Sequence, residues 1–331
     1  MDRIRLDTVV FEGESNAYVL ADTVTDRLTI VDVGVHHPNT QKKFQRELEK
    51  LGHAIDDIDD ILLTHFHYDH AGLAGSIQEE SGATVYCHPK TAAILELNTS
   101  ALIEEYERYR DRLQTWGLKE SECNDIISLL TNSASLAGQS IDCSTISGGA
   151  TLQLGSQSFD VVDLPGHTAG HLGYLSEANE LFVGDVVLPS TTPNIGGDLR
   201  ASNPLAAYFT SLERILLLAP RILWPGHGEA IRDITDRISA LVRHHDHRFD
   251  RVQEQLSPAP KRPRDIALSV FGTLDGIHLL HGTGEVAAHL DYLSERGAID
   301  RVEEGYVMRS QSPDVARYPQ ALANLLNETF E

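Results

Sequence analysis

The sequence predicts an α/β protein in which strands alternate with helices, followed by a smaller helical region. Short apolar runs typical of buried strands alternate with segments of helical periodicity along the first part of the chain. Several of these apolar runs end directly at a histidine or an aspartate. The length of 331 residues and the hydrophobic content of 41% are enough for one large packed domain and a small appendage.

The first elements follow one another in a regular order. An alternating strand region runs to about Val33, with a turn over residues 12–16. A helix is expected from near Asn39 to Leu51, and the apolar strand before the first histidine cluster comes next. A helix over residues 72–80 and a strand over residues 83–87 follow. This interleaving indicates layers of helices packed on a sheet.

The pattern changes between His88 and about Ser147. Tyr106, Tyr109 and Trp116 recur at helical spacing there, so we expect an inserted helical hairpin over about residues 90–147. Three interpretations of this aromatic stripe stay open. It packs in the interior, it covers the active site as a lid, or it forms the face of a homodimer.

A polar, turn-rich loop over residues 189–197 is expected to wall a substrate pocket. It is followed by a helix from Pro204 to Leu218, on which we expect Tyr208 to be a core residue. The next helix spans about residues 231–256 and carries three near-adjacent histidines between Arg243 and Arg248. Consecutive helical positions diverge by about 100°, so these imidazoles are interpreted as a solvated surface and not as a metal site.

Residues 257–263 are rich in proline and are expected to break the chain. Residues 287–299 then read as a helix closed by Gly297, and a short hairpin is expected from Val302 to Met308. We therefore place a domain boundary near residue 242, with residues 1–242 as the main domain and residues 243–331 as the appendage.

The densest chemical signal is a group of three imidazoles and one carboxylate directly behind the apolar run over residues 61–63. The group consists of His65, His67, Asp69 and His70. His65, His67 and Asp69 are spaced by two, so an extended segment would point them to one side. Together with His70 they could coordinate two adjacent cations. Asp69 alone could instead cap a helix, and each histidine alone could be a polar core residue. Four such residues together favour metal binding.

Three further residues stand at the ends of apolar runs. His167 follows the turn at Pro165 and Gly166, Asp185 ends the run from Leu181, and His227 follows a second Pro-Gly turn. Loops at strand ends of a rigid scaffold commonly carry active-site residues. The repeated arrangement therefore favours ligands over ordinary loop residues.

The signature His-x-His-x-Asp-His, followed by isolated His, Asp and His, resembles that of the metallo-β-lactamase superfamily. The resemblance spans most of the first 230 residues and implies an αββα sandwich. It implies that one cation is held by His65, His67 and His167, a second by Asp69, His70 and His227, and that Asp185 bridges them. It also implies that Asp32 supports the site from behind, although a turn residue before Gly34 is an equally good interpretation. His171 either braces the loop around His167 or simply begins the next strand.

Two divalent cations would generate a bridging hydroxide near neutral pH and polarise a carbonyl or phosphoryl oxygen. Asp69 is the candidate to orient the attacking water or accept its proton. Histidine and carboxylate ligands suit Zn²⁺ and also accommodate Fe or Mn. In agreement, the chain contains no Gly-x-Ser-x-Gly elbow and no phosphate-binding or dinucleotide-binding glycine motif.

The net charge is -22, and only six of the 27 basic residues are lysines. The composition resembles that of proteins from salt-accumulating halophiles, where screening removes most of the self-repulsion; acidic solubility is the alternative. This balance disfavours a nucleic-acid partner.

The three cysteines are widely spaced and are interpreted as reduced packing residues. With no apolar stretch long enough for a membrane span, we expect a cytoplasmic protein without a membrane partner.

The C-terminal helix and hairpin resemble the winged-helix appendage of proteins related to the β-lactamase-like endoribonucleases. Three functions are considered. The first is hydrolysis of a small-molecule thioester, ester or lactone, as in relatives of glyoxalase II, although the chain lacks a basic C-terminal cluster like the one that binds glutathione there. The second is a phosphodiesterase or endoribonuclease, favoured by the appendage and by the basic stretch from Arg243 to Arg264. The third is a non-catalytic winged-helix regulator, which the complete set of seven ligand positions argues against.

Overall fold

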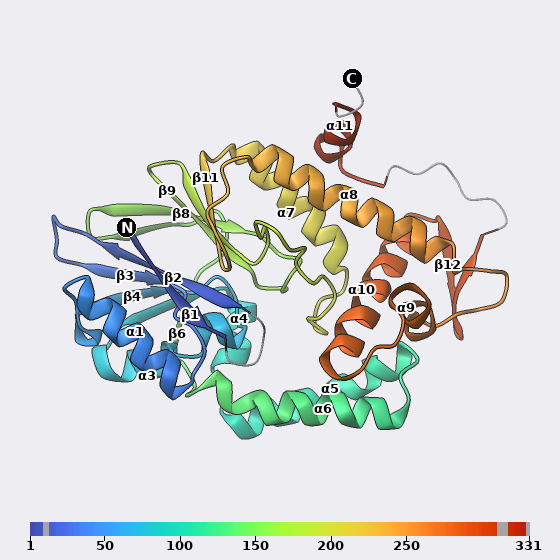
Figure 1. Ribbon diagram of the computed structural model, residues 1–331, viewed down its shortest axis with the longest axis horizontal. Coiled ribbons are helices and arrows are strands. Elements are labelled where there is room, and N and C mark those ends of the chain that lie inside the picture. Colours follow the sequence, from blue (N-terminus) through green and yellow to red (C-terminus); the bar gives the residue numbers. More distant parts are fainter. Residues whose placement is uncertain (9–12, 310–316, 329–331) are drawn as a thin grey trace.

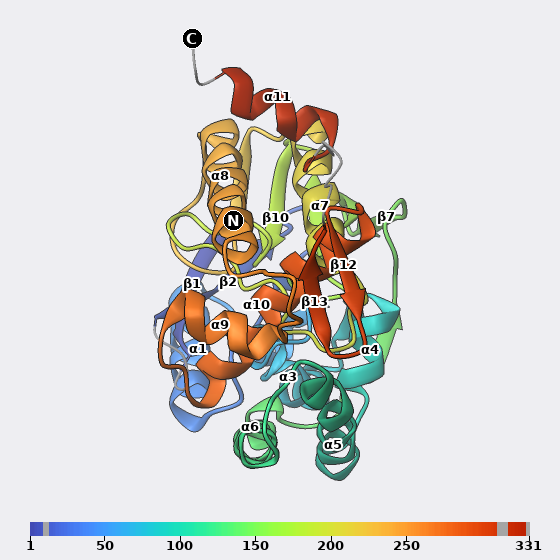
Figure 2. The same cartoon turned by 90° about the vertical axis from the view of Figure 1, so that its right-hand side faces the viewer.

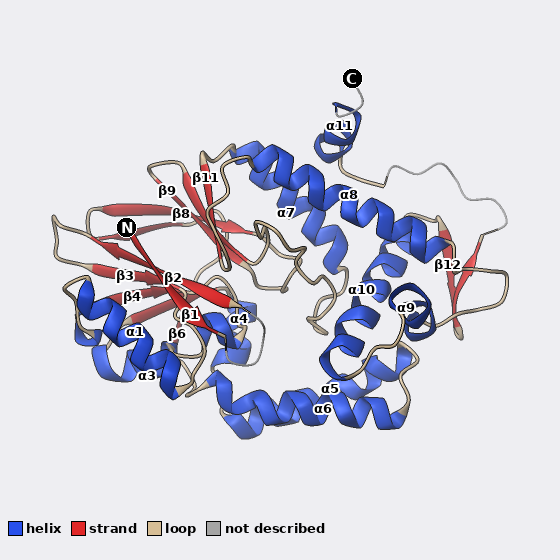
Figure 3. Ribbon diagram, viewed as in Figure 1, coloured by secondary structure: helices blue, strands red, loops and turns tan. Residues whose placement is uncertain are grey.

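A computed structural model describes residues 1–8, 13–309 and 317–328. Two sheets are stacked face to face, and helices cover the outer face of each (Figures 1 and 3). This arrangement confirms the predicted αββα sandwich.

The first sheet has, within the described residues, six strands in the order β1-β2-β3-β4-β5-β6. Strands β1 to β3 pair in antiparallel fashion, and β3 to β6 pair in parallel. All four residues of β3 are buried, as expected for a strand covered on both faces. The strands are β1 (Asp2–Asp7), β2 (Glu14–Ala21), β3 (Leu28–Val31), β4 (Ile58–Leu62), β5 (Thr84–Cys87) and β6 (Cys143–Thr145).

Two predictions for this sheet need correction. The turn was expected over residues 12–16, but Glu14, Ser15 and Asn16 already belong to β2, and residue 12 lies outside the described residues. The insertion was expected to extend to about residue 147, but it ends earlier because β6 rejoins the sheet beside β5. A three-residue edge strand carries too little periodicity to be recognised in sequence.

The second sheet has the order β11-β10-β9-β8-β7 over the described residues. Its last two strands in sequence, β10 and β11, are parallel, and the other pairs are antiparallel. The strands are β7 (Thr151–Leu154), β8 (Gln157–Asp163), β9 (Leu172–Ser176), β10 (Glu180–Gly184) and β11 (Ile222–Pro225).

Separate apolar clusters fill the layers. Between the sheets, Tyr18, Val31, Tyr174 and Phe182 belong to one cluster. The outer face of the first sheet is covered by α1 (Pro38–Lys50), α3 (Ala74–Ser81) and α4 (Pro89–Leu95). Helix α1 begins as the sequence indicates, with proline in its first turn, and it buries Phe44 and Leu48 against the sheet. The short helix α2 (Tyr68–Ala71) lies within the first histidine cluster.

The insertion is a helical hairpin, as predicted. It consists of α5 (Thr99–Thr115), α6 (Glu120–Ser133) and a short 3₁₀ turn, Ala134–Ala137. Tyr106, Leu113 and Trp116 are buried in one apolar cluster with residues of helix α10 (Gly276–Glu295). The aromatic stripe packs the insertion against the C-terminal region. A role as a lid or as a homodimer face stays a prediction.

The outer face of the second sheet is covered by α7 (Pro204–Leu218) and α8 (Ile234–Gln253). The remaining elements are α9 (Pro263–Phe271), α10, the hairpin of β12 (Ile299–Val302) and β13 (Gly305–Met308), and α11 (Gln320–Glu328). In the side view of Figure 2, α10 and the hairpin lie above α5 and α6. The predicted hairpin is present, whereas α10 begins well before the expected residue 287. A winged-helix assignment stays a prediction.

One apolar cluster runs from the second sheet through α7 and α8 into α9, α10 and the C-terminal hairpin. It joins residues on both sides of the predicted boundary at residue 242, such as Val242 and Phe249 on the same helix. The division into two domains stays a prediction, and the two parts share a hydrophobic core. Within the described residues, none of the helices combines the length and apolar character that a bilayer crossing requires.

Candidate metal centre

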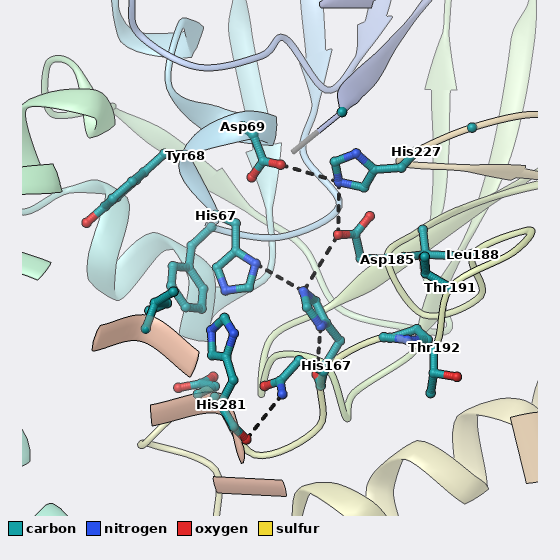
Figure 4. A pocket seen from close by; sticks show the side chains of 18 of the residues that line it. His67, Tyr68, Asp69, His167, Asp185, Leu188, Thr191, Thr192, His227 and His281 are labelled. Carbon is teal, nitrogen blue, oxygen red and sulfur yellow. Dashed lines mark hydrogen bonds and ion pairs between the residues drawn. The ribbon is translucent and has the colours of Figure 1, made fainter. Parts of the chain in front are cut away.

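The seven predicted ligands come from the segments that follow four strands, and Asp69 and His70 lie in the short helix α2. His65, His67, Asp69 and His70 follow β4, while His167 follows β8, Asp185 follows β10 and His227 follows β11. These strand ends meet at one edge of the sandwich. The structure brings all seven side chains together, although they are spread over more than 160 residues. Figure 4 shows His67, Asp69, His167, Asp185 and His227 around the cavity.

Three imidazoles form the first group. The Nδ1 atom of His67 lies 3.0 Å from Nε2 of His65 and 3.0 Å from Nε2 of His167. Three ring nitrogens that face one another at this distance cannot all be paired by hydrogen bonds, because each neutral ring carries only one N–H. A cation between them would satisfy all three lone pairs.

The second group combines a carboxylate with two imidazoles. Oδ2 of Asp69 lies 3.3 Å from Nε2 of His227 and 3.6 Å from Nε2 of His70. The two Nε2 atoms are themselves 3.3 Å apart. Mixed nitrogen and oxygen donors in this arrangement suit a second divalent cation.

Asp185 lies between the two groups. Its Oδ2 atom is 3.2 Å from Nε2 of His227, 3.6 Å from Nε2 of His70 and 3.8 Å from Nε2 of His167. Its Oδ1 atom is buried without a hydrogen-bond partner. An unpartnered buried carboxylate oxygen is costly unless a cation neutralises it, and this position fits the predicted bridge between two metal ions.

The other nitrogen of each of three ligand rings is occupied by a protein acceptor. Nδ1–H of His227 donates to the carbonyl oxygen of Glu14 at 2.8 Å, and Nδ1–H of His167 donates to that of Asn194 at 3.0 Å. Nδ1–H of His70 donates to Oδ2 of Asp32 at 2.9 Å. These bonds place a proton on Nδ1, so that Nε2 of each ring is the atom that faces the site and that would ligate a bound cation in its deprotonated form.

Asp32 therefore holds the site from behind. Its two carboxylate oxygens also accept the backbone N–H of Thr64 at 2.9 Å and the Thr64 hydroxyl at 2.8 Å. Asp32 has a φ of 56°, a left-handed conformation in which aspartate is tolerated better than most residues. The chain leaves β3 through this residue, so Asp32 is both the turn residue and the supporting carboxylate.

Two interpretations were given for His171, a brace for a ligand loop and the start of the next strand. It lies immediately before β9, and its ring stacks on that of His65 with centroids 4.9 Å apart. Its Nε2 atom accepts the backbone N–H of Asp185 at 3.2 Å. His171 thus braces the ligand loops from below.

The two groups differ in charge. Burial lowers the pKa of His67 to about 3, with a further contribution from His167, so the first group is neutral. Burial alone would also lower the pKa of His227, but the carboxylates of Asp185 and Asp69 outweigh it and raise this pKa to about 10. Burial would raise the pKa of Asp69, yet His70 and His227 together lower it to about 2. The second group is therefore an imidazolium and carboxylate cluster.

Glycines beside the ligands were missed by the sequence reasoning. A Cβ atom on Gly226 would lie 2.2 Å from Oδ1 of Asp185, and one on Gly184 would lie 2.6 Å from the Thr64 hydroxyl. Both positions need glycine, because ligand side chains crowd Gly226 and the supporting residues Thr64 and His171 crowd Gly184. The Pro-Gly turn at Gly226 is the sequence signal that could have identified the first of them.

One prediction about histidines is wrong. The segment from Arg243 to Arg248 was expected to be solvated, but His245 is only 1% exposed. Its Nδ1 atom lies 3.2 Å from Nε2 of His289 in the core between α8 and α10. The expectation that this segment binds no metal stays a prediction.

The ligands lie at one side of a cavity of about 580 Å³. Residues 189–194 line it, as expected for that loop, whereas Tyr208 is buried and donates its hydroxyl to the carbonyl oxygen of Val186 at 3.0 Å. His281 of α10 faces the ligands across the cavity (Figure 4). Burial lowers the pKa of His281 to about 4, so this ring is neutral at physiological pH.

Comparisons with known proteins agree with this geometry. The profile of the metallo-beta-lactamase superfamily matches residues 10–227. A probable metallo-hydrolase of Bacillus subtilis (strain 168) is 26% identical over 309 residues, which cover 91% of this chain and 94% of that protein. A hydroxyacylglutathione hydrolase of Bdellovibrio bacteriovorus is 25% identical over 219 residues, covering 66% of this chain and 64% of that protein.

A solved structure is similar over nearly the whole chain. The crystal structure of a metallo-beta-lactamase family protein from Thermus thermophilus matches with a TM-score of 0.79 and 25% identity, covering 93% of this chain and 98% of that chain. The likeness therefore extends beyond the residues that the family profile matches.

Proposed function

Because this chain belongs to the metallo-beta-lactamase superfamily, we propose that it is a binuclear metal-dependent hydrolase of a small-molecule thioester, ester or lactone. The observation that carries the proposal is the convergence of seven histidine and aspartate side chains at one side of a cavity. The converging ring nitrogens of these histidines and the unpartnered oxygen of Asp185 fit two divalent cations. Zn²⁺ is the metal proposed, with Fe and Mn as alternatives.

Two bound divalent cations would lower the pKa of a water toward neutrality and polarise the carbonyl of the substrate. The protein supplies the orientation. Asp69 is ionised and lies at the cavity, so its carboxylate can accept a hydrogen bond from the attacking water and take its proton. Asp32, Glu14 and Asn194 hold the rings of three ligands in place.

The choice of a thioester rests on the relatives. Two hydroxyacylglutathione hydrolases, from Bdellovibrio bacteriovorus and Haemophilus influenzae, match this chain at 25% and 27% identity. Glutathione itself is disfavoured as the carrier. Within the described residues, Arg5 is the only cationic side chain that lines the cavity, apart from the histidines, and it is paired with Glu229.

A nuclease is the weaker alternative because the basic stretch that suggested it is used internally. Arg264 forms an ion pair with Glu122 of the insertion, and Arg248 forms one with Glu285 at 3.0 Å. Arg251 donates to the carbonyl oxygen of Val270. These side chains stabilise the packing of the C-terminal region, so they are not available to bind the phosphates of a nucleic acid.

A substrate panel tests the function. Protein loaded with Zn²⁺, or with Mn²⁺, is assayed in high salt against a thioester, a lactone, a phosphodiester and an RNA. Turnover of the thioester or lactone that is lost on chelation and restored by metal is the expected result. Turnover confined to the phosphodiester or RNA would contradict the proposal.

The role of Asp69 is tested by Asp69→Asn. General base catalysis typically contributes about 10² to 10⁴-fold, so kcat should fall by that factor while both metal ions are retained. Asp160→Asn, on the exposed side of β8, is the matched control. Full turnover by Asp69→Asn with both ions bound would exclude the role.

The salt requirement is a separate proposal. The net charge of -22 should make the protein more stable at molar KCl than at low salt, because screening reduces self-repulsion. Urea denaturation across a KCl series measures this. Undiminished stability at low ionic strength would leave acidic solubility as the explanation of the composition.

A further inference from the structure

Beside the metal ligands, the cavity has an apolar part built by three separate segments. Tyr109 of α5 and Leu130 of α6 come from the insertion, Ile277 and Leu280 from α10, and Tyr68 from the ligand loop itself. We call these five residues the apolar chamber. No single one of the segments could enclose this space alone.

The chamber is held by specific contacts. The hydroxyl of Tyr68, between two ligands, is hydrogen-bonded to that of Tyr106 on α5. Arg112 of α5 donates to the carbonyl oxygens of Leu199 and Ala201, each at 2.9 Å. The insertion is thereby attached both to the ligand loop and to the loop after β10.

A second attachment joins that loop to α10. A Cβ atom on Gly196 would lie 2.2 Å from the carbonyl oxygen of Gly284, so the two backbones touch at a pair of glycines. The adjacent side of Gly284 is filled by Trp116 of the insertion. The walls of the chamber are therefore packed against one another, as expected for a largely pre-formed site.

The chamber also lacks charge. Its five residues carry no ionisable group other than phenols, and burial raises the pKa of Tyr109 to about 12, so that this phenol stays neutral. Arg200, near the cavity, lies with its guanidinium carbon 4.4 Å from the centroid of Phe66 and is paired with Asp198. A phosphate or carboxylate would find no free cation among these described residues, whereas an apolar group would exchange water for aromatic and aliphatic surface.

We propose that the apolar chamber binds an uncharged aliphatic or aromatic acyl group, so that the preferred substrates are thioesters or esters of apolar acids. This proposal rests on the hydrolase function proposed above. Each segment of the chamber then has a role in specificity. The scissile carbonyl lies at the ligands, and the acyl group extends between α5, α6 and α10.

The experiment uses a series of S-acyl-N-acetylcysteamine thioesters with acetyl, butyryl, hexanoyl, octanoyl and benzoyl groups. The thiol carrier is uncharged and constant, so only the acyl group changes. With the metal-loaded wild-type protein, kcat/KM should rise by up to about fourfold per added methylene, and by at least about tenfold from acetyl to octanoyl. A flat dependence on acyl length would overturn the proposal.

Two variants locate the effect. Ile277→Trp fills the chamber from α10 and should remove at least about tenfold of the advantage in kcat/KM of octanoyl over acetyl. Leu217→Trp is the matched control, because Leu217 is 76% exposed on α7 and remote in sequence from the chamber segments. Leu130→Ala enlarges the chamber from the opposite wall and should extend the preference to longer chains. An unchanged profile in both Ile277→Trp and Leu130→Ala would overturn the proposal.

A binding measurement separates this proposal from the hydrolase function. Octanamide, which is uncharged, is titrated calorimetrically into the wild-type, Ile277→Trp and Leu217→Trp proteins. Binding to the wild type and Leu217→Trp, but at least about tenfold weaker binding to Ile277→Trp, supports the chamber even if none of the thioesters is hydrolysed. Metal-dependent turnover of acetyl thioester without octanamide binding leaves the hydrolase standing and rejects the chamber. Octanamide binding without turnover of any ester or thioester supports the chamber and rejects the hydrolase.

Discussion

Two regions of this molecule bury several histidines, and only one has the geometry of a metal centre. At the strand ends, five histidines and two aspartates converge from four loops. Between α8 and α10, His245 and His289 lie side by side with their rings 5.2 Å apart, among the rings of Tyr208, Phe209 and Phe249. Both regions are largely shielded from bulk water, so burial alone does not distinguish them.

The difference lies in where the lone pairs point. In the core pair, Nδ1–H of His289 donates to the carbonyl oxygen of Glu285 at 2.7 Å, and its Nε2 accepts from Nδ1–H of His245. The two rings largely satisfy each other. At the metal centre the outer nitrogens are satisfied by Glu14, Asn194 and Asp32, and the inner ones face one another and the carboxylates. Convergent lone pairs, and not histidine density, define a metal site.

The largest effect that separates the regions should come from Asp185→Asn. The substitution keeps the shape but removes the charge shared by both ligand groups. We expect loss of at least one metal ion and a fall in kcat/KM on the order of 10³-fold, because metal ions contribute several kcal/mol and each 1.36 kcal/mol is tenfold. Metal analysis after dialysis and thioester assays measure this, with Asp160→Asn as the control. Two retained ions and normal turnover would show that Asp185 is not a bridge.

The pH dependence of metal binding should be the next largest effect. The raised pKa of His227, about 10, means that this ring is protonated at neutral pH before metal binds. Binding must displace that proton, and the carboxylates of Asp185, Asp69 and Asp32 outweigh burial and raise the pKa of His70 as well. Affinity should therefore fall as pH falls, by at least about tenfold per unit between about pH 8 and pH 6. Metal titrations at three pH values measure the slope. A slope that flattens above about pH 6.5, the ordinary value for histidine, would contradict the raised pKa.

Asp32→Asn should have a smaller effect on the same centre. An amide nitrogen in place of Oδ2 cannot accept from His70 and the Thr64 hydroxyl, so metal affinity should fall about 10 to 100-fold, as is typical for outer partners of metal ligands. Asp26→Asn is a matched control, because Asp26 has the same left-handed backbone, with a φ of 57°, in an exposed turn. Equal metal affinity in the two variants would leave Asp32 as a turn residue only.

The smallest effect, and none on metal content, is expected for His245→Phe. Burial lowers the pKa of His245 well below its ordinary value and that of His289 to about 4. The unfolded chain therefore binds more protons below about pH 6.5, and the free energy of unfolding falls as pH falls, by up to about 1.4 kcal/mol per unit for each histidine.

Urea denaturation at about pH 7.5 and about pH 5.5 measures this difference. At the higher pH, the free energy of unfolding of His245→Phe should stay within about 2 kcal/mol of the wild-type value. The substitution removes the unpartnered Nε2 of His245 but leaves Nε2 of His289 without its donor. The variant should lose less stability than the wild type at the lower pH. An equal loss in both proteins, or a change in metal stoichiometry, would place His245 outside this role.

The comparison also shows where sequence reasoning reached its limit. The ligand residues stand at strand ends, and a strand end can be recognised locally from an apolar run that stops at a turn. The prediction that His245 is solvated was wrong because burial on a helix cannot be recognised locally. Which face of a helix is buried depends on what packs against it, and the start of α10 at Gly276, which supplies that partner, was not recognised because glycines and histidines obscure its periodicity.

The sequence by itself determined the α/β layers, the strand-end positions of the seven candidate ligands and the helical nature of the insertion, because each of these depends on local periodicity and turn chemistry. Only the tertiary structure decided that Glu14 and Asn194 fix the tautomers of their ligands and that Gly196 meets Gly284. It also decided that the insertion and α10 enclose an apolar space together. Those contacts join residues that are distant in sequence, and their existence follows from how whole layers pack.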